Sequence, residues 1–272
     1  MQNKDMAIGV FDSGLGGLTA VKELMNVLPS ENIVYFGDTG RVPYGNRSVE
    51  TIIKYATQDA NFLLENNVKA IIAACGTVSS VATELEGQIP VPFTGVVVPT
   101  SKAAAKATKN LRVGVIGTTA TINSHSYKKC ISEINPEIEV FERDCPLFVP
   151  LVENGFTDPE SDIVSSVVEH YIAPLREQGV DTVILGCTHY PLLKAAIGEA
   201  FGEGVTLIDS GHATALYTAE LLRERNLLRD ESEKGEYSFY VSDTPHNFEN
   251  LAGAFLQRDI ERKVTQIDIE EY

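Results

Sequence analysis

Long hydrophobic stretches are missing from this sequence. No window approaches the roughly 18 uninterrupted apolar residues that indicate a membrane-spanning helix. The composition, 43% hydrophobic and 22% charged, is that of an ordinary globular domain. The first residues, MQNKDMAIGVFDSG, lack the apolar core and cleavage region of a signal peptide. These absences predict a cytoplasmic protein without a membrane partner.

Positive charge is also scarce. Lys and Arg number 22 against 38 Asp and Glu, which gives a formal net charge of −16 at pH 7. Binding to nucleic acids or to anionic membranes requires an excess of basic residues, so we expect neither partner. A small anionic substrate is compatible with this charge, because the local field inside a pocket can oppose the overall charge.

Cysteine is rare and lacks the spacing of a metal site. The four cysteines are Cys75, Cys130, Cys145 and Cys187, and none belongs to a Cys-x-x-Cys pair. We therefore expect no structural zinc and no other bound metal. Disulfides are rare in the cytoplasm, so we interpret all four as free thiols, each either a buried filler or a chemical group.

Two common phosphate-binding motifs are absent from the glycine-rich turn DSGLGG. This turn contains Gly14, Gly16 and Gly17, but Thr19 stands where GxGxxG requires glycine, and the lysine of a Walker motif is missing. Its backbone N–H groups suit a carboxylate as well as a phosphate. The turn therefore gives no reason to expect a nucleotide.

Strands and helices alternate along the chain. Strands are expected where short apolar or β-branched runs end in turn residues, at 7–11, 32–36, 68–74, 112–116, 138–141, 182–185, 205–208 and 237–241. Helices are expected where apolar residues recur at helical spacing, at 18–28, 48–66, 162–178, 192–201 and 247–256. Ser48 is the expected N-cap of the second helix. This order predicts an α/β fold with parallel sheets and a site at the carboxyl ends of the strands.

Two pairs of similar motifs indicate an internal duplication. The turn IGVFDSG at 8–14 resembles VGVIGTT at 113–119, and IIAACGT at 71–77 resembles VILGCTH at 183–189. The alternative is that any parallel α/β protein shows such self-similarity. With a duplication, each half brings one cysteine to the end of a buried strand.

The duplication predicts two similar parallel-sheet α/β domains that face each other across a cleft. We expect the first domain to comprise 1–97 plus 210–272 and the second to comprise 98–209. The last strand and helix of the chain then return to the first domain and complete its sheet.

Cys75 and Cys187 occupy matched positions, since each follows a buried apolar strand and precedes a threonine. Backbone N–H groups and the positive end of a following helix favour a thiolate there. The alternative is that both are core cysteines. Two thiols that face one substrate suit an amino-acid racemase, in which one group removes the α-proton and the other returns a proton on the opposite face. Cys130 and Cys145 lack the strand-end position and are interpreted as structural.

Asp12, Ser13 and His189 are the other candidate site residues. Asp12 and Ser13 follow the first strand, and Asp12 is expected to tune Cys75 or to bind the substrate ammonium; its alternative role is helix N-capping. His189 lies two residues beyond Cys187 and is the expected proton partner of that thiol. A lone histidine is otherwise more often structural.

In combination, these motifs resemble glutamate racemase. DSGLGG, YFGDTGRVPYG, the CGT turn and GCTHYPLL occur in the order and spacing of that family, and the match runs from about residue 8 to 210. The resemblance implies two α/β domains with the active site between them and no cofactor such as pyridoxal phosphate. It also implies a cytoplasmic homodimer that supplies D-glutamate for peptidoglycan, and hence for cell-wall biogenesis and cell shape.

The resemblance further implies roles for individual residues. Cys75 would deprotonate D-glutamate and Cys187 would deprotonate L-glutamate, assisted by Asp12 and His189. Substrate contacts are implied for a set that comprises Asp12, Ser13, Tyr44, Gly45, Gly76, Thr77 and Thr188, and Glu153 matches a further acidic residue near the second thiol.

One residue beside the thiols departs from the family pattern. The family sequence Cys-Asn-Thr is Cys75-Gly76-Thr77 here, so Gly76 contributes only backbone where an Asn side chain normally touches the substrate. This departure leaves open a racemase of a related acidic amino acid such as aspartate. A separate alternative is a non-catalytic binding protein on the same scaffold, against which the presence of Cys75, Cys187, Asp12 and His189 argues.

Overall fold

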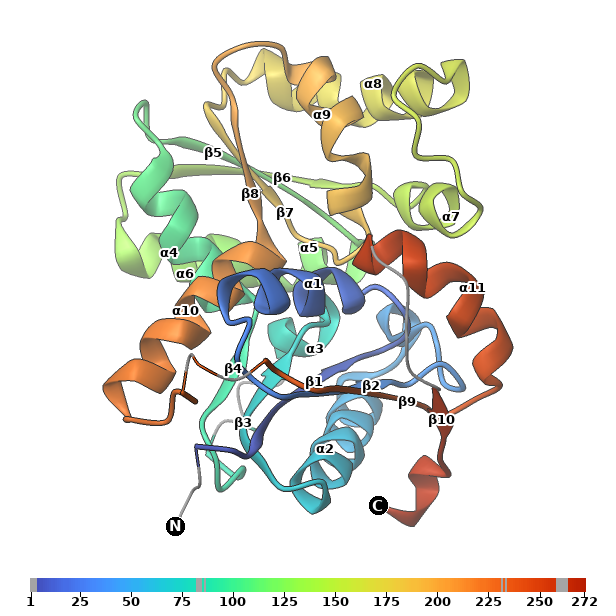
Figure 1. The fold of residues 1–272 in the computed structure, drawn as a ribbon. Coiled ribbons are helices and arrows are strands. Elements are labelled where there is room, and N and C mark those ends of the chain that lie inside the picture. Colours follow the sequence, from blue (N-terminus) through green and yellow to red (C-terminus); the bar gives the residue numbers. More distant parts are fainter. Residues whose placement is uncertain (1–3, 82–84, 86, 231, 233, 258–263) are drawn as a thin grey trace.

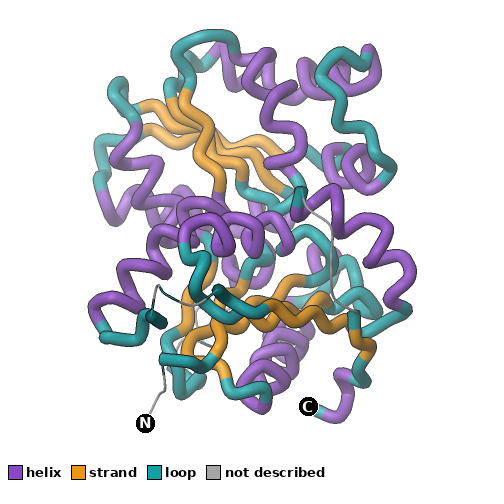
Figure 2. The backbone as a smooth tube through the Cα atoms, viewed as in Figure 1, coloured by secondary structure: helices purple, strands orange, loops and turns teal. Residues whose placement is uncertain are grey.

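The computed structural model describes residues 4–81, 85, 87–230, 232, 234–257 and 264–272. It confirms the predicted α/β class, because it contains two parallel sheets with helices around them (Figure 1). In the tube view the strands, coloured orange, form two separate groups, one for each sheet (Figure 2). No helix among the described residues is long and apolar enough to span a membrane.

The first sheet contains six strands in the order β10-β9-β2-β1-β3-β4. Their bounds are β1 Ala7–Asp12, β2 Ile33–Gly37, β3 Val68–Ala73, β4 Phe93–Gly95, β9 Tyr237–Val241 and β10 Thr265–Gln266. In the middle of the sheet Gly9 pairs with Val34 on one side and Ile71 on the other. The expected return of the C-terminal strand is confirmed, since β9 pairs in parallel with β2.

The second sheet contains four strands in the order β6-β5-β7-β8. Their bounds are β5 Arg112–Gly117, β6 Glu139–Asp144, β7 Thr182–Leu185 and β8 Thr206–Asp209. This order repeats β2-β1-β3-β4 of the first sheet, as expected of a duplicated unit. The domain boundaries after 97 and 209 stay a prediction.

Helices cover both sheets, and α1, α3 and α5 lie between them (Figure 1). Helix bounds are α1 Leu18–Val27, α2 Val49–Glu65, α3 Gly76–Val81, α4 Val97–Ala107, α5 Thr119–Ser124, α6 Ser126–Ile134, α7 Phe148–Glu153, α8 Asp162–Glu177, α9 Lys194–Phe201, α10 Ser210–Glu224 and α11 Pro245–Leu256. Short 3₁₀ turns cover Tyr44–Asn46, Tyr190–Leu193 and Ile269–Glu271. Ser48 caps α2 as predicted, because its side chain accepts a hydrogen bond from the Thr51 N–H.

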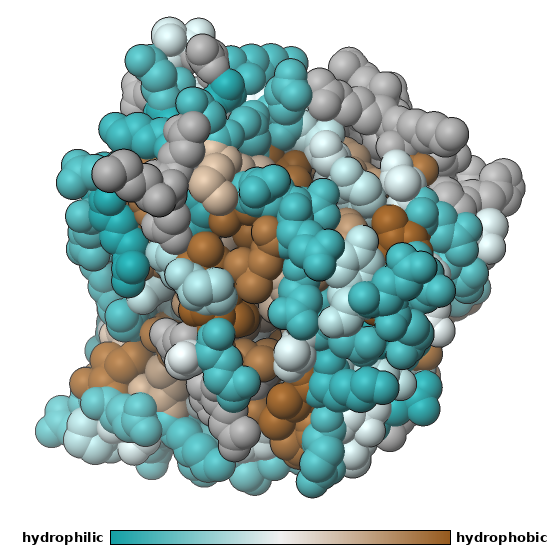
Figure 3. All heavy atoms as spheres, turned by 90° about the horizontal axis from the view of Figure 1, so that it is seen from below, coloured by the Kyte–Doolittle hydropathy of each residue, from teal (hydrophilic) through white to brown (hydrophobic). Residues whose placement is uncertain are grey.

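Hydrophilic side chains cover most of the face below the first sheet, and hydrophobic ones show between them toward the middle of the view (Figure 3). Most of the interior is apolar, but it also contains buried charged residues, one of which lies on β3. Lys69 is fully buried there, and its Nζ lies 2.5 Å from Glu31 Oε2 and donates to the Leu227 carbonyl at 2.8 Å. A buried ion of this kind is tolerated only while its partners are in place.

Replacement of Lys69 by methionine is expected to destabilise the fold by about 3–5 kcal/mol, because the buried Glu31 carboxylate loses its counter-charge. The measurement is urea unfolding at neutral pH. In the double variant Lys69→Met/Glu31→Gln no unpaired charge remains, and much of the lost stability should return. An unchanged unfolding midpoint in the single variant would contradict this account.

Candidate active site

The carboxyl ends of strands from both sheets border one cavity of about 520 Å³. Its lining includes every site residue predicted from the sequence, namely Asp12, Ser13, Tyr44, Gly45, Cys75, Gly76, Thr77, Glu153, Cys187, Thr188 and His189. The two sheets contribute one thiol each, Cys75 after β3 and Cys187 after β7. The cavity thus brings the candidates together, while their individual roles stay predictions.

Cys75 is a buried thiol rather than the thiolate that its strand-end position suggests. The residue is 6% exposed, and its Sγ donates to Ser13 Oγ at 3.4 Å. Burial and the nearby Asp12 carboxylate raise the pKa of Cys75 to about 11, against the opposing effect of Ser13 and of the backbone N–H groups of Val78 and Thr77. The predicted thiolate is therefore wrong for Cys75 at neutral pH, because desolvation outweighs the N–H groups.

Asp12 ends β1 and is 2% exposed. Its Oδ2 accepts a hydrogen bond from the Gly14 N–H at 3.1 Å, whereas its Oδ1 is shielded from solvent and has no partner among the described residues. Burial raises the pKa of Asp12, and the charge of His189 and the N–H groups of the glycine turn act against that rise. A carboxylate with a raised pKa and a free oxygen is suited to exchange a proton with a nearby thiol. The N-cap of α1 is Gly17, so Asp12 lies outside that position.

Cys187, His189 and Glu153 form a hydrogen-bonded chain on the other side of the cavity. His189 Nδ1 lies 3.9 Å from Cys187 Sγ, and His189 Nε2 lies 3.1 Å from Glu153 Oε1 on α7. Burial by itself lowers the pKa of His189, but the contacts with Cys187 and Glu153 outweigh it and raise the pKa to about 10. His189 is therefore an imidazolium at neutral pH and can supply the proton that Cys187 exchanges.

Helices α1 and α11 support the surroundings of the second thiol. Thr19 Oγ1 donates to the Thr188 carbonyl at 2.9 Å, and the Phe255 ring of α11 stands edge-on to His189 with centroids 5.3 Å apart. A Cβ at Gly16 would lie 2.1 Å from Thr188 Oγ1 and 2.7 Å from the His189 ring. Only glycine fits this approach, so the DSGLGG turn packs directly against the CTH turn.

The raised pKa of His189 predicts a pH-dependent contribution to stability. A group whose pKa rises on folding stabilises the fold fully below its ordinary value of 6.5 and loses this effect as the pH rises to about 10. Wild type is therefore expected to exceed His189→Gln in free energy of unfolding by about 2 kcal/mol or more at low pH, with the gap closing toward pH 10. Urea unfolding of both proteins across this range measures the gap, and a gap that widens with pH would refute the assignment.

Tyr44 borders the cavity, but its hydroxyl is hydrogen-bonded to residues outside the cavity lining. The hydroxyl donates to Asp38 Oδ2 and lies 3.1 Å from Asp59 Oδ2, and the residue is 1% exposed. A substrate contact through that hydroxyl is therefore not available. Contact through the backbone of Tyr44 and Gly45 stays a prediction.

A second pair of glycines brings the two cysteine turns together. Gly76 and Gly186 both border the cavity, and a Cβ at Gly76 would lie only 2.8 Å from the Gly186 carbonyl oxygen. Gly186 in turn directly precedes Cys187. The departure from the family pattern at Gly76 therefore coincides with a backbone-to-backbone approach between the two thiol-bearing turns.

Sequence reasoning missed part of the cavity lining. The segment 118–121 borders the cavity, and the sequence signal for it is the VGVIGTT turn, the counterpart of IGVFDSG in the first half of the chain. Cys145 also borders the cavity and directly follows β6, so the conclusion that it lacks a strand-end position was wrong. The expected strand at 138–141 actually ends at Asp144, because β6 is an edge strand whose half-exposed positions hold charged residues.

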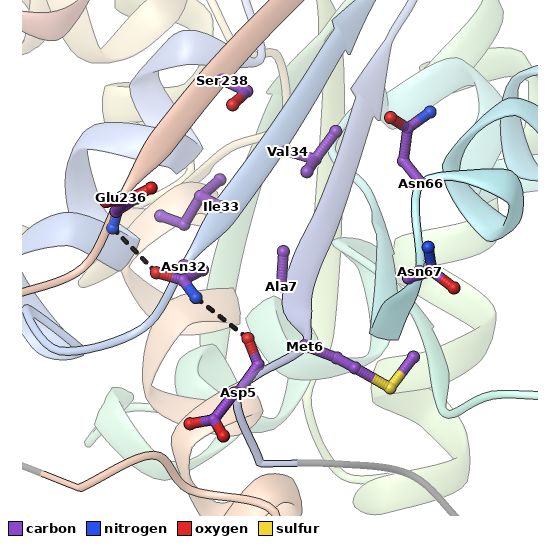
Figure 4. A pocket seen from close by; sticks show the side chains of 10 residues that line it. All are labelled: Asp5, Met6, Ala7, Asn32, Ile33, Val34, Asn66, Asn67, Glu236 and Ser238. Carbon is purple, nitrogen blue, oxygen red and sulfur yellow. Dashed lines mark hydrogen bonds between the residues drawn. The ribbon is translucent and has the colours of Figure 1, made fainter.

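A shallower hollow of about 380 Å³ lies at the opposite, amino end of the first sheet (Figure 4). Asn32 there donates to the Asp5 carbonyl at 2.9 Å and accepts from the Glu236 N–H at 2.9 Å, so its amide ties together neighbouring strand ends. None of the predicted site residues lines this hollow. Within the described part of the chain, no group of three or more His, Cys, Asp or Glu residues is arranged to hold a metal ion.

Comparison with known proteins agrees with the geometry. The Asp/Glu/Hydantoin racemase family model matches residues 24–218. A glutamate racemase from Geobacter metallireducens is 50% identical over 251 residues, 92% of either chain. A crystal structure of a Bacillus anthracis glutamate racemase isoform superposes with a TM-score of 0.92 at 37% identity, covering 98% of both chains. That of Francisella tularensis glutamate racemase in complex with D-glutamate superposes with a TM-score of 0.89 at 40% identity, covering 99% of this chain and 100% of that one. The chain therefore belongs to the Asp/Glu/hydantoin racemase family, in its glutamate racemase branch.

Proposed function

We propose that this protein interconverts L-glutamate and D-glutamate by passing the α-proton between two thiols. The observation that carries the proposal is the cavity itself, which is bordered by Cys75 from one sheet and Cys187 from the other. Glutamate as the substrate is supported by the names of relatives that match more than nine-tenths of the chain.

The mechanism uses one thiol as the base and the other as the acid. In the L-to-D direction Cys187 takes the α-proton, and Cys75 donates its proton to the opposite face of the carbon. The raised pKa of Cys75 keeps that proton available at neutral pH, and Asp12 is the group that takes and returns it between turnovers. In the D-to-L direction Cys75 takes the α-proton, and Cys187, which has His189 beside it, donates the proton.

Side chains around the cavity complement the charged groups of the substrate. Ser13, Thr77 and Thr188 present hydroxyls for the carboxylates, and Asp12, which also borders the cavity, is the acidic residue for the ammonium group. We propose that no cofactor takes part, since a thiol pair supplies both the base and the acid.

We also propose the biological setting that the resemblance implies. The enzyme acts in the cytoplasm as a homodimer and supplies D-glutamate for peptidoglycan. We further propose that the cavity lies between one domain formed by 1–97 plus 210–272 and a second formed by 98–209; this division is supported by the contribution of both halves of the chain to the lining.

The test of this function is proton exchange with inversion. L-glutamate and L-aspartate are incubated separately with the protein in D₂O without added cofactor. Loss of the α-proton is followed by NMR and inversion by circular dichroism. We expect both signals with glutamate. If only aspartate exchanges its α-proton, the substrate is aspartate and not glutamate. If neither amino acid exchanges, the result favours a non-catalytic binding protein on the same scaffold.

A further inference from the structure

A cluster of buried charged residues lies behind one wall of the cavity. We name Asp38, Arg41, Tyr44 and Asp59 the wall cluster. Arg41 Nε lies 2.6 Å from Asp38 Oδ2, and Arg41 Nη2 lies 3.0 Å from Asp59 Oδ1. Both carboxylate side chains are fully buried, and that of Arg41 is only 11% exposed. The Tyr44 hydroxyl bonds to the same two carboxylates.

The wall cluster is connected to the cavity at both ends of a short segment. At its start, the Asp38 N–H donates to the Asp12 carbonyl at 2.9 Å, which extends the pairing of β2 with β1 by one step. At its other end, residues 42–45 border the cavity. The backbone between these points has no strand or α-helix to hold it. It is held by two hydrogen bonds to the residues after β9, from the Gly40 N–H to Ser242 Oγ at 2.8 Å and from the Asp243 N–H to Thr39 Oγ1 at 3.1 Å, and by the side chains of the cluster.

Further contacts fix Arg41 and Asp38 from outside the cluster. The Arg41 guanidinium lies 4.1 Å from the centre of the Tyr55 ring on α2. Ser242 Oγ, just after β9, donates to Asp38 Oδ1 at 2.7 Å. An outer contact joins Arg41 Nη1 to Glu270 Oε1 at 3.3 Å, but the Glu270 side chain is 58% exposed. The buried contacts therefore dominate the placement of Arg41.

The guanidinium is necessary because the two carboxylates are buried on either side of it. Burial and the proximity of Asp38 raise the pKa of Asp59 well above its ordinary value, and Arg41 acts against that rise. A planar guanidinium reaches both carboxylates at once, whereas a lysine ammonium acts as a point charge and reaches one.

We propose that Arg41 is a positioning residue for substrate binding: held between Asp38 and Asp59, it fixes segment 42–45 as the cavity wall against which the substrate is bound. This inference rests on the proposed racemase function. Arg41 itself is absent from the cavity lining, so it acts through the wall and not by touching the substrate.

The test is the steady-state kinetics of Arg41→Lys with both enantiomers. We expect KM to rise about 10-fold in both directions and kcat to change less than about 3-fold, because a displaced wall weakens binding while both thiols stay in place. The matched control is Glu270→Gln, which removes the negative charge of the exposed partner of the same guanidinium, leaves its contacts with Asp38 and Asp59 in place, and is expected to leave KM unchanged.

Each outcome decides the proposal. An unchanged KM in a folded Arg41→Lys protein overturns it, and so does a fall in kcat at constant KM. If Arg41→Lys does not fold, Tyr44→Phe decides, since it removes the hydroxyl from both carboxylates and keeps the ring. A raised KM in Tyr44→Phe supports the proposal that the wall cluster fixes segment 42–45, and an unchanged KM contradicts it. Wild type without glutamate racemization would refute the proposed function, whereas an active wild type with a normal variant refutes only the role of Arg41.

Discussion

Replacement of Cys75 by alanine is expected to lower glutamate racemization by about 10²- to 10⁴-fold, the contribution of a positioned acid or base. The variant keeps Cys187 with His189 3.9 Å from its sulfur, so one side of the cavity is intact. It should therefore still exchange the α-proton of L-glutamate with D₂O, but without inversion. Cys187→Ala is expected to show the mirror behaviour, with exchange confined to D-glutamate. Combined NMR and circular dichroism measure exchange and inversion on one sample.

The other cysteines provide the controls for this experiment. Cys130 lies half-buried on α6 and does not border the cavity, so Cys130→Ala should racemize like wild type. Cys145 borders the cavity but is fully buried, and its Sγ donates to the Arg143 carbonyl at 3.8 Å. Cys145→Ala is thus expected to keep both exchange and inversion. Full racemization by either Cys75→Ala or Cys187→Ala would refute the two-thiol scheme.

The positions of the two thiols were predictable because the strands before them are buried on both faces. Such strands produce continuous apolar runs, and β3 and β7 have no exposed residue. Their carboxyl ends are therefore visible in the sequence, and so are the cysteines that follow. β6 shows the converse, because it is an edge strand whose last residues are charged and carry no apolar signal. The sequence therefore did not reveal that Cys145 follows the end of a strand.

The properties that depend on three-dimensional contacts were not predictable. The sequence indicates a thiolate at Cys75, but the pKa is set by how deeply the fold buries the sulfur and by the charge of Asp12. Likewise, a tyrosine in a PYG loop gives no sign that its hydroxyl points to Asp38 and Asp59 rather than to the substrate. Both features depend on how the fold orients and buries side chains, and local sequence patterns carry no information on either.

Substitution of Gly76 is expected to lower kcat/KM about 100-fold, even when the new residue is the asparagine typical of the family. Any Cβ at this position would lie 2.8 Å from the Gly186 carbonyl oxygen, a backbone atom that cannot rotate aside. Relief requires the turn that carries Cys187 to move away from the turn that carries Cys75. A misplacement of about 1 Å at a reacting group costs on the order of 10²-fold in rate.

Comparison of Gly76→Ala with Gly76→Asn separates two physical effects. If the Cβ decides, both variants lose activity alike. If the missing amide group limits substrate binding instead, Asn should outperform Ala and approach or exceed wild type, which would contradict the steric account. Gly198→Ala is the matched control, because a Cβ there would lie 3.8 Å from Leu207 Cδ1, an ordinary contact on α9. Equal loss in both Gly76 variants with a normal control would mean that this chain has exchanged a side-chain contact for a closer approach of its two thiol-bearing turns.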